Sequence, residues 1–111
     1  MNINQEKMAA VAAVESKADL ICDVADQIWE YAELSLQEFR SAALYCEVLE
    51  REGFRVKKGI CNIDTAFLAS YGSGRPMIGI LAEYDALSGL SQRAGGLERE
   101  EIVAGGTGHG C

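Results

Sequence analysis

The regular apolar pattern of this sequence stops near Asp85, and this break limits which part of the chain can build a core. Before the break, apolar residues recur with the periods of helices and strands. After it, residues 86–111 are rich in glycine and show no sustained period. A segment of that length without regular structure is either a functional loop or a tail. The whole chain, at 111 residues, fits one domain.

Two helices are predicted in the first half. Over residues 5–33 an apolar stripe repeats at spacings of three and four, through Val14, Ala18, Ile21, Ala25, Ile28 and Ala32. Residues 36–52 follow a capping-box pattern in which Ser35 and Glu38 would each bond to the other's backbone. The buried face of this second helix is expected to hold Leu36, Phe39, Ala43, Cys46 and Leu49. Gly53 is expected to end it in a Schellman turn.

Three strands are predicted next. Residues 54–58 alternate as an edge strand would, and residues 64–71 are rich in aromatic and β-branched types. Residues 77–83 begin with a continuous apolar run, which is typical of an interior strand buried on both faces. The predicted fold class is therefore α/β, with two N-terminal helices packed on a small mixed sheet.

The net charge and the spacing of the cysteines indicate which partners the protein does not bind and in which cellular compartment it is expected. A net charge of −7 without a basic patch argues against binding to nucleic acid or to an anionic membrane. No stretch reaches the ~20 apolar residues of a membrane span, and no export signal is convincing. The four cysteines form no C-x-x-C pair. We expect a cytoplasmic protein with reduced thiols.

Two clusters carry possible chemistry. Glu83 and Asp85 directly follow the predicted interior strand, where ligand sites of α/β sheets often lie. They could hold a metal or orient its ligands, or they could simply mark where the strand reaches solvent. His109 and Cys111 lie in a glycine-rich run, and imidazole and thiolate both suit zinc. The alternatives there are a flexible tail with a chance His and Cys, or a thiol catalyst using Cys111.

Taken in order, four segments resemble the zinc metallopeptidase family of aminoacylases and carboxypeptidases. They are Glu33–Ala43, Glu52–Val56, Ile78–Leu87 and Gly108–Cys111. The strings Glu83-Tyr84-Asp85-Ala86-Leu87 and Gly108-His109-Gly110-Cys111 are most similar to the amidohydrolase branch, and within it to the aminobenzoyl-glutamate hydrolase type.

The resemblance implies that residues 1–111 are the N-terminal portion of a larger α/β metallohydrolase catalytic domain. That domain would hold two divalent ions, zinc or manganese, and hydrolyse the amide bond of a small-molecule N-acyl amino acid. The resemblance makes Cys111 a metal ligand, puts His109 near the metal and makes Asp85 a residue that orients a ligand. Glu83 falls where some relatives have a ligand histidine. The general base, further ligands and a dimerising domain would lie beyond this sequence, so we expect a homo-oligomer and no activity from this chain alone.

A second hypothesis comes from a different class. The chain could be a small, non-catalytic α/β interaction domain that self-associates through an exposed strand edge.

Overall fold

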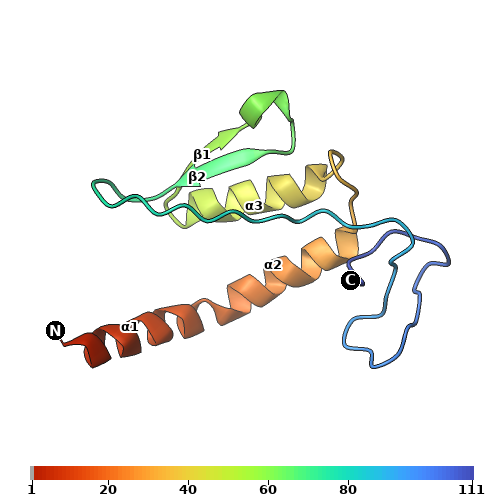
Figure 1. Ribbon diagram of the computed structural model, residues 1–111, viewed down its shortest axis with the longest axis horizontal. Coiled ribbons are helices and arrows are strands. Elements are labelled where there is room, and N and C mark those ends of the chain that lie inside the picture. The colour runs from red at the N-terminus through yellow and green to blue at the C-terminus, as the bar shows by residue number, and fades with distance from the viewer. Residues whose placement is uncertain (1) are drawn as a thin grey trace.

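The computed structural model describes residues 2–111, and its elements lie in the first two thirds of that range (Figure 1). Three helices come first: α1 (Ile3–Ser16), α2 (Ala18–Tyr31) and α3 (Phe39–Arg51). Two short strands follow, β1 (Arg55–Lys58) and β2 (Phe67–Ser70), with a 3-10 turn (Ile60–Asn62) between them. None of the helices in this part of the chain combines the length and the apolarity that crossing a bilayer requires.

The first predicted helix is two helices, so the single helix over residues 5–33 was wrong. Asn2 caps α1 in a reciprocal pair of bonds with Gln5. At the other end the Ser16 hydroxyl donates to the carbonyl of Ala13, and the Lys17 N–H donates to Val14. These i−3 bonds tighten the last turn, and the backbone leaves the helical region at Lys17.

The apolar stripe of this region is only partly buried. Ile28 is in the core, as expected, but Val14 and Ile21 are exposed. Val24, which the stripe did not include, is buried instead. Within Ile3–Ser16 no residue is buried, because α1 extends away from the body of the molecule (Figure 1).

The capping box predicted for the second helix is not formed. Leu36 has a left-handed backbone with φ of 66°, and α3 begins at Phe39. The Ser35 side chain makes no cap, and the Glu38 carboxylate accepts from the Thr65 hydroxyl at 2.8 Å. The N–H groups at the start of α3 are satisfied by Glu33, described below.

The packing of α3 also differs from the expected face. Cys46 is buried as predicted, but Leu36, Phe39 and Ala43 are exposed, while Ser41 and Ala42 are buried. The predicted Schellman end is confirmed: Phe54 N–H donates to the Leu49 carbonyl at 2.9 Å and Gly53 N–H to Glu50 at 3.1 Å.

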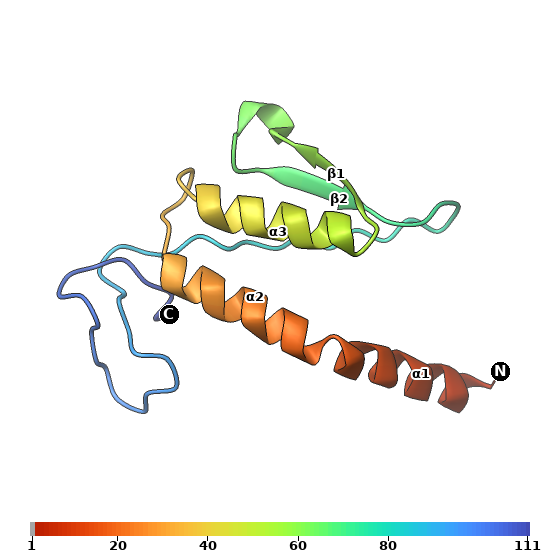
Figure 2. The same ribbon diagram turned by 180° about the vertical axis from the view of Figure 1, so that it is seen from behind.

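The sheet has two antiparallel strands, with Arg55 opposite Ser70 and Lys58 opposite Phe67. It packs on α3, on the side away from α2 (Figures 1 and 2). The α/β class is confirmed, but the sheet is not mixed, and residues 77–83 form no strand. They run extended in the direction of the α3 axis (Figure 1), with Met77 92% and Leu81 93% exposed. A strand needs a neighbour for its backbone groups, and in the described part of the chain this segment has none.

The core is small and lies where α2, α3 and the start of the tail meet. Its buried apolar residues are Val24, Ile28, Ala42, Cys46 and Ala86. Beside it, Tyr84 packs against Tyr45 and Phe67, with ring centroids 5.3 and 6.1 Å away. This aromatic cluster fixes the chain directly before Asp85.

Candidate functional site

The predicted site residues lie around the C-terminal end of α2. Asp85 is half-buried, and the next residue, Ala86, donates its N–H to the Glu33 carbonyl at 2.7 Å. Leu34 and Ala86 also form an isolated parallel bridge. Asp85 is therefore held beside the connection between α2 and α3, whereas Glu83 is exposed.

His109 is half-buried against α2. Its ring lies 6.0 Å from the Trp29 ring, centroid to centroid, with 34° between their planes. The Nε2 atom of His109 is buried and has no hydrogen-bond partner among residues 2–111. A buried imidazole nitrogen without a partner is costly, so this atom calls for a partner that residues 2–111 do not supply.

Cys111 has a free and exposed thiol two residues further on. Within residues 2–111, no three His, Cys, Asp or Glu side chains lie close enough to hold a metal ion together. The chain thus presents donor atoms of the right type, but not a complete metal site. The roles predicted for Asp85, His109 and Cys111 stay predictions.

Close backbone packing explains part of the glycine content of the tail. Leu87 and Gly108 exchange two backbone hydrogen bonds of 3.0 and 3.1 Å. A Cβ atom at Gly108 would lie 2.2 Å from the Leu90 carbonyl oxygen, which no real side chain tolerates. Glycine at this position lets the tail fold back on residues 87–91.

Glu33 lies next to the candidate site, and its role in capping α3 was not predicted from the sequence. Its side chain is 12% exposed, and its carboxylate accepts from the N–H groups of Arg40 and Ser41 and from the Ser41 hydroxyl, at 2.7–3.0 Å. Burial alone would raise the pKa of Glu33, but these bonds and the Arg40 charge lower it below its ordinary value. One sequence feature could have indicated this role: Glu33 is an acidic residue a few positions before the first turn of α3, where negative charge is favoured.

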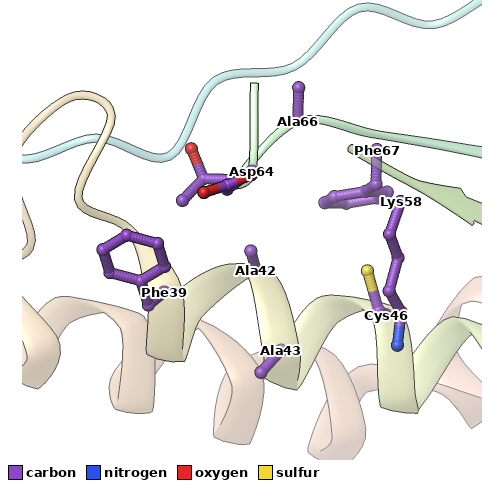
Figure 3. A pocket seen from close by; sticks show the side chains of 9 residues that line it. Phe39, Ala42, Ala43, Cys46, Lys58, Asp64, Ala66 and Phe67 are labelled. Atoms are coloured by element: carbon purple, nitrogen blue, oxygen red, sulfur yellow. The ribbon is translucent and has the colours of Figure 1, made fainter. Parts of the chain in front are cut away.

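Two open cavities flank these elements. One of about 460 Å³ lies between the end of α2 and the tail, and Trp29, Ala32, Val103 and Thr107 contribute to its lining. The other, of about 170 Å³, lies between α3 and residues 64–67, with Cys46 in its wall (Figure 3). Burial raises the pKa of the Cys46 thiol, which keeps it protonated and unreactive at neutral pH. None of Asp85, His109 and Cys111 lines either of these two cavities.

Comparison with known proteins gives an informative relative. The chain is 46% identical over 99 residues to one of the subunits of p-aminobenzoyl-glutamate hydrolase from Escherichia coli (strain K12). The match covers 89% of the chain and 21% of that relative, so the chain spans about a fifth of the relative's length. No family model and no solved structure matches the chain. The identity confirms the resemblance to the aminobenzoyl-glutamate hydrolase branch.

Proposed function

We propose, since the chain is a relative of the aminobenzoyl-glutamate hydrolases, that it forms part of the catalytic domain of a metal-dependent amidohydrolase. The substrates would be N-acyl amino acids of the aminobenzoyl-glutamate type. The observation that carries the proposal is the sequence identity to the Escherichia coli hydrolase.

The donor atoms of the tail support a metal site in part. The buried, unpartnered Nε2 of His109 and the exposed thiol of Cys111 are a nitrogen and a sulfur donor of the kind that zinc prefers. Because residues 2–111 hold no group of three donors, the proposal requires further ligands from other parts of the enzyme.

In this proposal the side chains of this region bind a metal ion and orient its other ligands. Cys111 binds an ion, His109 lies at or beside it, and Asp85 orients a ligand from its place next to the α2–α3 connection. The Trp29 ring lies beside the His109 ring, with the two centroids 6.0 Å apart. When bound, the ions would supply an acidified water and polarise the amide carbonyl.

A chimera tests this function. The chain would replace its matching segment in the Escherichia coli hydrolase, and hydrolysis of aminobenzoyl-glutamate would be measured with added zinc or manganese. We expect turnover that Cys111→Ser removes. A folded chimera without turnover, or one that Cys111→Ser leaves fully active, would contradict the proposal.

The chain by itself gives a complementary test. Because its donor set is incomplete, we expect no amide hydrolysis and only weak metal binding from the 111-residue protein. Clear turnover that Cys111→Ser removes would show instead that these residues already make a complete site.

A non-catalytic interaction domain is the second candidate, and one observation favours it. Met77, Ile78, Ile80 and Leu81 form an apolar strip whose members are 83–93% exposed. Exposed strips of this kind often mark binding surfaces. A discrete dimer in light scattering, together with an inactive chimera, would favour this candidate.

A further inference from the structure

The C-terminal end of α2 is bonded to two segments that are distant in sequence. The last carbonyls of a helix have no donors within the helix and need partners from elsewhere. Here the carbonyl of Ala32, the C-cap of α2, accepts from the Thr107 hydroxyl at 2.7 Å. The carbonyl of Glu33, the residue directly after the cap, accepts from the Ala86 N–H at 2.7 Å. Both donors are two residues or fewer from a predicted site residue, His109 in one case and Asp85 in the other.

Thr107 makes a side-chain hydrogen bond that ties the end of the tail to the C-cap of α2. The residues around it are Gly105, Gly106, Gly108 and Gly110, which have no side chains with which to set a register. The other bonds of residues 108–110 go to Leu87 and Leu90, which belong to the same irregular segment. The Thr107 hydroxyl therefore ties residues 105–111 directly to the end of α2, whereas their other tie is indirect and runs through residues 87–91 to Ala86 and Glu33.

We propose that Thr107 is a positioning residue for the candidate metal ligands. Its hydroxyl fixes the tail on the end of α2 and thereby sets the His109 ring against Trp29, with Cys111 following two residues later. The role given to His109 and Cys111 rests on the proposed function. The placement of the tail by Thr107 does not.

Trp29 reports this placement directly, because it is the one tryptophan of the chain and its ring lies beside His109. Quenching of its fluorescence by acrylamide measures how open the ring is to solvent. Thr107→Val keeps the shape of the side chain and removes the hydroxyl, whereas Thr107→Ser keeps the hydroxyl. His109→Ala shows the quenching expected when the imidazole no longer covers Trp29.

We expect Thr107→Val to shift the quenching of Trp29 toward the value of His109→Ala, and Thr107→Ser to match the unchanged protein. Thr107→Ala repeats the test should the valine variant fail to fold by circular dichroism. Unchanged quenching in a folded hydroxyl-free variant would overturn the proposal. So would a Thr107→Ser variant that behaves like Thr107→Val.

Cobalt(II) alone, added to the chimera described above, which supplies the further ligands, separates the placement by Thr107 from the metal-binding role of Cys111. All the cobalt measurements use this chimera. A thiolate bound to cobalt gives a charge-transfer absorption, which Cys111→Ser would remove. We expect this band to weaken in Thr107→Val and to persist in Thr107→Ser. Loss of Trp29 shielding in Thr107→Val with no cobalt band even in the unchanged protein would support the positioning by Thr107 and count against the proposed role of Cys111.

Discussion

Glu33 uses both of its oxygen-bearing groups to join three segments. Its carboxylate satisfies the first turn of α3, and its carbonyl holds the backbone of Ala86 beside Asp85. The bonds to the carboxylate outweigh burial and lower its pKa. One side chain therefore contributes to the stability of α3, while its backbone helps to place a predicted site residue.

Replacing Glu33 by Gln should lower the free energy of unfolding by about 1 kcal/mol, the usual value of a helix cap. A group whose folded pKa is lowered stabilises the protein above its unfolded value, here 4.5, and loses that contribution as the pH falls through the folded pKa. The variant should therefore lose less stability than the unchanged protein below pH 4.5. Urea unfolding at several pH values measures both effects.

Glu47→Gln is the matched control for this substitution. The Glu47 side chain is 68% exposed and its ion pair with Arg51 spans 3.7 Å, so its removal should be nearly neutral. Equal effects of the two substitutions would contradict the capping role of Glu33.

Tyr84 gives a second prediction at this scale. Burial, followed by the negative charge of Glu38, raises its pKa to about 12, and its hydroxyl donates to the Thr65 carbonyl. A raised folded pKa favours the neutral phenol, so this contribution is present below pH 10 and is lost as the pH rises toward 12. Tyr84→Phe should lower the free energy of unfolding by about 1 kcal/mol at neutral pH. It should also reduce the loss of stability that the unchanged protein shows at alkaline pH. Tyr71→Phe, at a 71% exposed ring, should do neither.

Single residues were the hardest to predict from the sequence. Ser35 and Glu38 have the spacing of a capping box, but Leu36 turns left-handed and moves the start of α3 to Phe39. The actual cap comes from Glu33, and its reach depends on the path of the turn rather than on spacing. Thr107 was equally hidden, because its partner Ala32 lies 75 residues earlier in the chain.

At the scale of elements, two local signals predicted the structure correctly, and the signal for a strand that needs a distant partner did not. The Schellman end of α3 and the strand over residues 55–58 depend on neighbours in sequence, and both are present. The strand expected over residues 77–83 depends on pairing with another strand, which residues 2–111 do not supply. Helices α1 and α2 were joined in the prediction because an apolar period does not report a local break at Lys17.

The end of α3 offers a test of an element. Gly53 has φ of +93°, so Gly53→Ala should cost about 1 kcal/mol or more through backbone strain alone. A new Cβ would lie 3.4 Å from the Tyr71 ring, an ordinary contact that adds no clash. Gly79→Ala is the control, because its Cβ would meet nothing within 4 Å. Thermal unfolding followed by circular dichroism compares them, and a Gly53→Ala variant as stable as Gly79→Ala would argue against the left-handed turn.

At the scale of the whole molecule, the class of the fold and the relationship to the hydrolases were both accessible from the sequence. The α/β class follows from the order of helical and strand periods among the apolar residues. The relationship to the hydrolases follows from short sequence strings such as Glu83–Leu87. The sequence did not predict which segments are buried, because the burial of a helix or strand face depends on what other segments cover it. The apolar strip at Met77, Ile78, Ile80 and Leu81 was expected inside a sheet and lies in solvent.

This strip should make the chain self-associate as its concentration rises. Ile80→Lys places a charge in the middle of the strip, where the native side chain is 92% exposed, and should lower the average mass in light scattering without loss of stability. Ile102→Lys adds the same charge at a 67% exposed position outside the strip and should leave the mass unchanged. Equal effects of the two would mean that net charge, and not the strip, governs association.

The isolation of α1 has a consequence for how this chain loses its structure. A helix of 14 residues that rests on no core gains little from its neighbours and is marginal in water on its own. Its coil transition is therefore broad and separate from the collective collapse of the remaining structure. The ellipticity lost on warming would be the sum of the gradual melting of α1 and the cooperative unfolding of the rest. A two-state fit of the whole curve would wrongly assign the melting of α1 to the body of the protein.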